Sequence, residues 1–284
     1  MILGDALQSA TQTLLRKGID DASAEAEILL GHVLGMSKTQ LYTEPEKALT
    51  STEISQLWSL IQRRLNHEPA AYILGHCEFY GIDLLLDCHT FIPRPETELL
   101  VEQAVELAHR ISQPGKGITI ADVGTGCGAI AVSLAMALPQ AQIYATDISA
   151  RALQVAEMNC QRHAVSSHVE LLQGNLLEPL SQPVDMIVAN LPYIKDCEFK
   201  DLSPEIIDFE PTSALAGGLN GLDEIQRMLE QMPGKLSREG SFLLEIGQGQ
   251  GRVVTSLIKG QFQQANIELI SDLGGIERVV KVRL

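Results

Sequence analysis

The chain has 284 residues, 45% of them hydrophobic, which is enough apolar material for the cores of one large domain and one smaller domain. That composition excludes a disordered chain. The formal net charge of -15 is spread along the sequence, so it favours solubility and disfavours a nucleic-acid partner, although a local basic groove can coexist with a negative total.

Cysteine and hydropathy patterns bear on the compartment. The cysteines include no Cys-x-x-Cys pair, which predicts reduced thiols in a cytoplasmic protein and no metal site. Residues 1–10 lack a basic segment followed by an apolar core, so no secretory signal is predicted. Asp122 and several glycines interrupt the least polar long run, residues 118–138, so we expect a buried strand, turn and helix there and no membrane span.

Residues 1–66 show the apolar spacing of successive helices. The clearest is the third, because Thr50 and Glu53 form a capping box ahead of its apolar stripe. We therefore expect an N-terminal helical bundle, with a domain of residues 1–72.

A β-hairpin linker is predicted over residues 73–92. Pro69 ends the bundle because the residue before a proline is pushed out of helical conformation. Two short β-rich runs then turn near Gly81. The run Pro93-Arg94-Pro95-Glu96-Thr97-Glu98 follows, and its prolines hold the backbone extended before it opens a helix that reaches Ile111.

After a break at residues 113–117 the pattern alternates between strands and helices. Buried strands are predicted at 118–123, 142–146, 169–173, 185–189, 241–246, 267–271 and 278–282. Helices are predicted at 129–138, 150–163, 222–231 and 252–259. This regular exchange implies parallel strands joined by right-handed crossovers. Residues 272–275 are too few for a crossover helix, so the closing strand is expected to run antiparallel to its neighbour.

A glycine-rich loop lies between the first buried strand of this domain and its helix. Gly124, Gly126 and Gly128 have the context of a ligand loop, since glycine lets the backbone approach a ligand and the helix N-terminus offers free N–H groups. The spacing is Gly-x-Gly-x-Gly, which differs from the dinucleotide pattern. A tight turn without a ligand is the alternative interpretation.

Two aspartates favour a particular cofactor. Asp147 ends the next strand about 20 residues on, where an acidic side chain meets the ribose hydroxyls of a nucleoside, although it could also cap the following helix. Asp122 lies just before the glycines, where a carboxylate suits a positively charged ligand amine and suits a pyrophosphate poorly. The pattern therefore favours S-adenosyl-L-methionine as the cofactor.

The tetrapeptide Asn190-Leu191-Pro192-Tyr193 follows the strand at 185–189, at the edge where open α/β sheets bind their ligands. Conjugated amide or amino nitrogens are poor nucleophiles, so a site that methylates them must accept their N–H protons and orient the nitrogen. The Asn190 side-chain carbonyl and a main-chain carbonyl near Leu191 are suitable acceptors, and the Tyr193 ring can pack on a flat group. A simple turn after a strand is the alternative.

Together these motifs resemble class I S-adenosylmethionine-dependent methyltransferases that modify planar nitrogens. With the Pro-Arg-Pro-Glu-Thr-Glu run at 93–98 and the segment from Glu210-Pro211 to Gly221, the chain resembles the HemK/PrmC family of release factor glutamine methyltransferases over nearly its whole length. The resemblance implies an α/β fold with a doubly wound seven-stranded sheet over residues 93–284, a substrate-recognition role for residues 1–72, and no membrane.

The family's substrate is the glutamine of the Gly-Gly-Gln motif in class 1 peptide chain release factors. The resemblance implies catalytic roles for Asn190, Pro192 and Tyr193. It implies that the acceptor glutamine is bound by Asn190, Leu191, Pro192 and Tyr193. It assigns the cofactor to Asp122, Gly124, Thr125, Gly126, Cys127, Gly128, Asp147, Asn175, Leu176 and Asn190.

The chain departs from the family pattern at three positions. Leu191 replaces a proline, Asn175 replaces an aspartate, and Cys127 replaces a serine or threonine. Cys127 is not expected to be a nucleophile, because an elbow needs glycines where Thr125 and Ala129 stand.

Three other functions are compatible with parts of the pattern. Methylation of adenine or another ring nitrogen in DNA or RNA uses the same Asn-x-Pro-Tyr logic, but it requires a basic path for the strand. A binding module without turnover is opposed by the intact acidic residues and Asn190. A dehydrogenase is opposed by the glycine spacing.

Overall fold

The structure is a computed structural model that describes residues 1–111 and 117–284, so most of the predicted break at 113–117 lies outside the described residues. It divides into two compact units. The helical unit comprises Met1–His76 and Ser203–Phe209, and the sheet unit comprises Cys77–Leu202 and Glu210–Leu284. Each unit has a hydrophobic core of its own.

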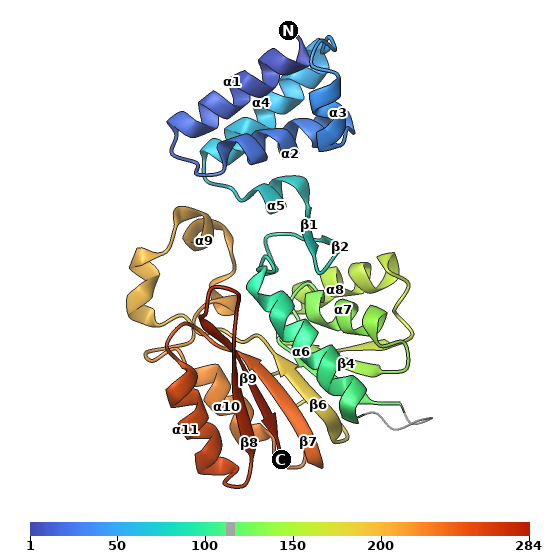
Figure 1. The fold of residues 1–284 in the computed structure, drawn as a ribbon, viewed down its shortest axis with the longest axis vertical. Helices are drawn as coiled ribbons and strands as arrows, with labels where there is room; N and C mark the ends of the chain where they lie inside the picture. Colours follow the sequence, from blue (N-terminus) through green and yellow to red (C-terminus); the bar gives the residue numbers. More distant parts are fainter. Residues whose placement is uncertain (112–116) are drawn as a thin grey trace. The chain divides into compact units, whose positions relative to one another are not determined.

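In the helical unit α1, α2 and α4 lie alongside one another and bury their apolar stripes between them (Figure 1). The predicted capping box is confirmed, because Thr50 Oγ1 accepts from Glu53 N at 3.2 Å and Glu53 Oε2 accepts from Thr50 N at 2.7 Å. The bounds of the helices before the hairpin are Leu3–Arg16 (α1), Ala22–Leu34 (α2), Lys38–Thr43 (α3), Ser51–Leu65 (α4) and Ala70–Leu74 (α5).

Besides α3, two short helices of this unit were not predicted. Pro69 does end the preceding pattern, but it occupies the N-cap position of α5 with an extended backbone, so a further turn of helix follows it. The second is α9, Pro204–Phe209, which belongs to a segment that the sequence pattern leaves as a loop. Glu205 of α9 pairs with buried Arg64, which also pairs with Glu25 of α2. A guanidinium in the interior requires such carboxylate partners.

The sheet unit contains the predicted seven strands in the order β5-β4-β3-β6-β7-β9-β8. All neighbours are parallel up to β7, whereas β9 is antiparallel to both β7 and β8, which confirms the predicted fold. A separate hairpin of β1 and β2 turns at Gly81. The strand bounds are His76–Phe79 (β1), Ile82–Leu85 (β2), Thr119–Val123 (β3), Gln142–Asp147 (β4), Val169–Gln173 (β5), Val184–Ala189 (β6), Leu236–Glu245 (β7), Asn266–Ser271 (β8) and Glu277–Arg283 (β9).

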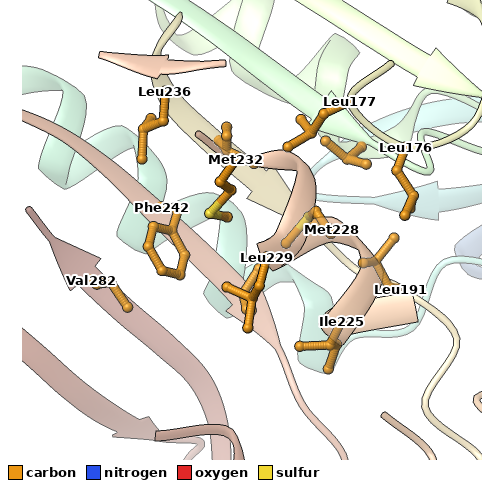
Figure 2. Packing of buried hydrophobic residues seen from close by; sticks show 14 of the residues in the cluster. Leu176, Leu177, Leu191, Ile225, Met228, Leu229, Met232, Leu236, Phe242 and Val282 are labelled. Carbon is orange, nitrogen blue, oxygen red and sulfur yellow. The ribbon is translucent and has the colours of Figure 1, made fainter. Parts of the chain in front are cut away.

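Helices cover both faces of the sheet, with α6, α7 and α8 on one and α10 and α11 on the other (Figure 1). Figure 2 shows how α10 inserts Ile225, Met228, Leu229 and Met232 among the side chains of the sheet, at the spacing of one helical face. The bounds are Glu96–Ile111 (α6), Ala129–Ala137 (α7), Ala150–Arg162 (α8), Asp223–Gln231 (α10) and Gly251–Gln261 (α11). No helix in the described part of the chain is long and apolar enough to cross a membrane.

The connection from β6 to α10 shapes one edge of the sheet. It contains the 3-10 helices η1 (Asp196–Asp201) and η2 (Thr212–Ala214) on either side of α9. After η2 the chain returns to the exit of β6, where Ile194 N donates to Leu215 O at 3.0 Å and Gly217 N donates to Ile194 O at 2.8 Å. This pairing holds the tetrapeptide that begins at Asn190 against the segment ending at Gly221.

Candidate active site

The parallel register brings four distant residues to one edge of the sheet. Val123 of β3 pairs with Thr146 of β4 and Ala189 of β6, and Ala189 pairs with Leu244 of β7. The next residue along each strand is therefore Asp147, Gly124, Asn190 or Glu245, in that order across the sheet. Three of these are predicted site residues, and we call the four the edge row.

The glycine loop joins β3 to α7 with positive φ at all three glycines. Gly128 is the tightest, because its φ is +85° and a Cβ would lie 3.2 Å from Ala156 Cβ of α8. The thiol of Cys127 is buried, and burial raises its pKa, which disfavours the thiolate that a nucleophile needs.

Asp122 is fully buried beneath this loop. Its Oδ2 accepts from Thr125 Oγ1 at 2.6 Å and from Ala131 N in the first turn of α7 at 3.0 Å. Its Oδ1 has no hydrogen-bond partner among the described residues. Burial raises the pKa of Asp122 to about 7, with these two donors opposing the shift. The carboxylate therefore fixes the loop to the helix and keeps one oxygen for another donor.

Asp147 closes the loop from the neighbouring strand. Its Oδ2 accepts from Gly126 N at 2.9 Å, and its Oδ1 accepts from Ser149 N at 2.8 Å. Each carboxylate oxygen keeps a further lone pair, and the side chain is only partly buried. Burial raises its pKa, and the accepted N–H groups oppose that shift. Ile148, the next residue, is 67% exposed.

The pair Asn175 and Leu176 follows β5. The Asn175 side chain is already engaged, since its Nδ2 donates to Glu178 Oε1 at 2.9 Å and its Oδ1 accepts from Arg227 Nη2 at 2.8 Å. Leu176 has a positive φ of 52° and is buried, and its main-chain oxygen accepts from Thr146 Oγ1 at 2.8 Å. The turn is therefore anchored to the end of β4, beside Asp147.

The tetrapeptide Asn190-Leu191-Pro192-Tyr193, which we call the acceptor tetrapeptide after its predicted role, lies directly against the glycine loop. A Cβ built on Gly124 would be 3.3 Å from Leu191 Cδ2 and 3.8 Å from Asn190 O. The Leu191 side chain is buried in the core cluster with α10 (Figure 2). This explains the departure from proline, because an apolar side chain at this position fills the space between the loop and α10 while its main-chain carbonyl is retained.

The Asn190 side chain meets two residues that the sequence did not assign to the site. Its Nδ2 donates to Thr97 Oγ1 at 3.0 Å, and Asn190 and Thr97 both oppose the rise in the pKa of the Glu245 carboxylate as its hydrogen-bonding neighbours. Thr97 is the first-turn threonine of α6, and Glu245 is the last residue of β7. A polar residue at the end of an apolar strand was the available signal for Glu245.

Tyr193 is held by glycines and by Gln250. A Cβ on Gly217 would lie 2.8 Å from Tyr193 Cα, and one on Gly221 would lie 2.3 Å from Tyr193 O. The Gln250 amide donates to Gly221 O at 3.0 Å and to Tyr193 O at 3.3 Å, and it accepts from Gly247 N at 2.8 Å. Burial raises the pKa of Tyr193 to about 12, so its phenol stays neutral.

Comparison with known proteins is decisive at this point. Residues 5–75 match the family model of the PrmC N-terminal domain, and residues 97–212 match that of the methyltransferase small domain. The chain is 39% identical to a release factor glutamine methyltransferase of Koribacter versatilis (strain Ellin345), over 99% of this chain and 98% of that protein. It is 38% identical to the protein of the same name from Moorella thermoacetica (strain ATCC 39073 / JCM 9320), over 98% and 97%.

The chain belongs to the release factor glutamine methyltransferase family. Solved structures support the methyltransferase fold. A methyltransferase from Pyrococcus furiosus has a TM-score of 0.51 at 16% identity, covering 72% of this chain and 90% of that one. A ribosomal protein L11 methylase from Lactobacillus delbrueckii subsp. bulgaricus has a TM-score of 0.50 at 21% identity, covering 69% and 82%.

In this family member the Pro-Arg-Pro-Glu-Thr-Glu run is explained by its contacts. Arg94 pairs with buried Glu210 and lies over the Phe91 ring at 4.7 Å. Glu98 Oε1 accepts from Tyr80 N of the hairpin turn at 2.9 Å, and Thr97 contacts Asn190. The run therefore ties the hairpin and the β6–α10 connection to the acceptor tetrapeptide.

The structure brings most of the predicted site residues together, in the edge row and in the glycine loop and acceptor tetrapeptide beside it. Asn175 is the outlier, because its polar atoms are paired with Glu178 and Arg227. The residues that sequence reasoning missed are Thr97, Glu245 and Gln250, and the last two lie outside both family-model matches.

Proposed function

We propose that this chain transfers a methyl group from S-adenosyl-L-methionine to the side-chain amide nitrogen of the glutamine in the Gly-Gly-Gln motif of class 1 peptide chain release factors. The observation that carries this proposal is the amide of Asn190, presented beside a glycine loop that suits a nucleoside cofactor. Both reported relatives are named release factor glutamine methyltransferases, which supports the same substrate.

The residues around the loop fit that cofactor. Asp147 retains lone pairs for two neighbouring ribose hydroxyls. Beneath the loop, Oδ1 of Asp122 has no hydrogen-bond partner among the described residues. Exposed Ile148 and buried Leu176 offer apolar surface for a flat purine. When bound, S-adenosyl-L-methionine supplies an electrophilic methyl group on a sulfonium.

The chain's own residues then position the acceptor. Asn190 Oδ1 and the main-chain carbonyl of Leu191 accept the two amide N–H groups, which turns the nitrogen lone pair toward the methyl group. Tyr193 packs its neutral ring against the flat amide. No general base is required, because the methylated nitrogen sheds its proton after attack.

We also assign release-factor recognition to residues 1–72, connection to residues 73–92 and methyl transfer to residues 93–284. The helical unit has its own core, which supports a separate role for the first of these. Ile28 is 49% exposed on α2. Ile28→Glu should raise KM for the release factor without changing cofactor affinity, and the fully exposed Leu273→Glu in the β8–β9 turn is the matched control. Equal effects of both changes would contradict the assignment.

One experiment tests the reaction itself. Labelled S-adenosyl-L-methionine is incubated with the protein and either a release factor, its Gln→Ala variant at the Gly-Gly-Gln motif, or DNA and RNA. We expect label in the intact release factor alone. Because release factors work in the cytoplasm, we propose that the reaction takes place there. Label in the Gln→Ala variant or in nucleic acid would contradict the proposal.

A further inference from the structure

Glu245 is a buried carboxylate behind the acceptor tetrapeptide. It is 3% exposed, and its Oε2 has no hydrogen-bond partner among the described residues. Thr97 of α6 and Asn190 after β6 are its hydrogen-bonding neighbours. Burying a carboxylate costs free energy unless it is paired and hydrogen-bonded, so the position of Glu245 needs an explanation.

The hydrogen-bond chemistry of this cluster has a direction. An ionised carboxylate can only accept, so the Thr97 hydroxyl, which opposes the rise in the pKa of Glu245 as its hydrogen-bonding neighbour, faces the carboxylate as a donor. The Thr97 oxygen is then left to accept, and Asn190 Nδ2 donates to it at 3.0 Å. Both acceptors therefore attract the NH₂ end of the Asn190 amide, and the Oδ1 end is turned away from them.

We propose that Thr97 and Glu245 are positioning residues that lock the Asn190 amide so that Oδ1 faces the acceptor nitrogen. This inference rests on the proposed function, since the orientation matters only if Asn190 receives an N–H group. Neither residue touches the reacting atoms, and both act through Asn190. The alternative is that the cluster only stabilises the fold, with no effect on the orientation of the amide.

The proposal implies a pH dependence of turnover. Burial raises the pKa of Glu245 to about 7, with Thr97, Arg278 of β9 and Asn190 opposing the shift and Glu96 of α6 adding to it. Tyr193 also faces the carboxylate, but its own raised pKa keeps it neutral over this range. When Glu245 is protonated it can donate to Thr97, and the fixed direction of this series of hydrogen bonds is lost. Turnover should fall as the pH drops through about 7.

The test compares two substitutions at one position. Thr97→Val removes the hydroxyl at nearly constant volume, and Thr97→Ser keeps it. We expect Thr97→Val to lower kcat about tenfold, the value of one well-placed hydrogen bond, with cofactor affinity unchanged, and Thr97→Ser to stay within about twofold. Thr97→Val should also flatten the acid limb of the pH profile. Thr255→Val is the control, because its hydroxyl oxygen is buried without a partner in the described residues.

A second variant keeps the proposal open to refutation if Thr97→Val folds poorly. Glu245→Gln replaces a group that can only accept with an amide that can accept or donate, and it should lower kcat about tenfold and remove the part of the limb near neutral pH that Glu245 contributes. Wild-type kcat and an unchanged pH profile in folded Thr97→Val and Glu245→Gln would overturn the inference while leaving the proposed function intact. An inactive wild-type protein in the release-factor assay would instead count against the proposed function.

Discussion

Two buried carboxylates lie on either side of strand β6, and they differ in where their partners come from. Asp122 of β3 and Glu245 of β7 are both buried, both have pKa values raised to about 7, and each has one oxygen without a partner in the described chain. Asp122 binds Thr125 and Ala131, within 9 residues. The hydrogen-bonding neighbours of Glu245 are Asn190 and Thr97, which bond to each other across 93 residues of sequence.

The two carboxylates therefore belong to two parts of the candidate site that are built in different ways. On the proposed cofactor side, the partners of Asp122 lie on a strand, a loop and a helix that are continuous in sequence, and the glycines mark the loop in the sequence. On the acceptor side, three segments meet only because the sheet register and α6 bring them together. Variants on each side should therefore change different quantities.

The largest effect is expected from Asn190→Ala. In the proposed reaction this amide accepts a substrate N–H, so turnover should fall about a thousandfold, because positioning is worth several kcal/mol. Cofactor affinity should stay nearly unchanged. Isothermal titration and steady-state kinetics separate the two quantities, and Asn266→Ala on the exposed start of β8 is the control. A near-normal rate would remove Asn190 from the mechanism.

The next effect is expected from Gly221→Ala. A Cβ there would lie 2.3 Å from Tyr193 O at a φ of +70°, so the acceptor tetrapeptide must shift, and turnover should fall about a hundredfold. Gly275→Ala is a matched control, since its φ is +77° and no described atom lies within 4 Å of its Cβ. Both variants should lose about 1 kcal/mol of stability through backbone strain. Similar turnover in the two would contradict the close approach.

On the cofactor side, Asp147→Ala should raise the cofactor Kd about thirtyfold, as two charge-assisted hydrogen bonds are lost. Asp147→Asn keeps an oxygen for Gly126 N and should fall between wild type and Asp147→Ala. Titration calorimetry measures all three. An unchanged Kd in Asp147→Ala would rule out the ribose contact.

A smaller effect is expected from Gln250→Glu. The carboxylate would still accept from Gly247 N but would face the carbonyls of Gly221 and Tyr193, which are now donated to by the Gln250 amide. Turnover should fall about tenfold and stability by about 2 kcal/mol. Exposed Gln248→Glu makes the same charge change two positions away. If both variants melt and turn over alike, Gln250 does not hold the tetrapeptide.

The smallest effect is on stability and its dependence on pH. The pKa of Glu245 rises from 4.5 to about 7 in the native protein, so the folded chain holds a proton that the unfolded chain releases. Stability should therefore fall as the pH rises through this window and stay lower above it. Glu245→Gln should be more stable than wild type by on the order of 1 kcal/mol at about pH 8 and not at about pH 5. If the free energy of unfolding differs between wild type and Glu245→Gln by the same amount at both pH values, the burial of an ionised Glu245 is contradicted.

Much of the fold follows from local pattern. Alternating strands and helices specify parallel neighbours, and the short turn after Asp272 specifies the antiparallel last strand. The short helices α3, α5 and α9 were not predictable, because too few residues carry the period. For α9 the stabilising contact is Arg64 with Glu205, which are 141 residues apart in the chain.

The candidate site divides in the same way. Asp122, the glycines and Asp147 were predictable because each follows a strand and precedes a helix. Thr97 has the appearance of a helix-opening residue and Gln250 that of a surface glutamine, and only the register of β6 and β7 and the packing of α6 show their contacts. Glu245 was the most readable of the three, since an acidic residue ends an apolar run.

The most direct test of this division is the single-turnover rate of Asp147→Ala and Asn190→Ala at saturating cofactor with a release factor as acceptor. The division predicts that saturation restores Asp147→Ala to near the wild-type rate, because its defect lies in binding, and leaves Asn190→Ala slow. A slow Asp147→Ala at saturation, or a restored Asn190→Ala, would contradict it.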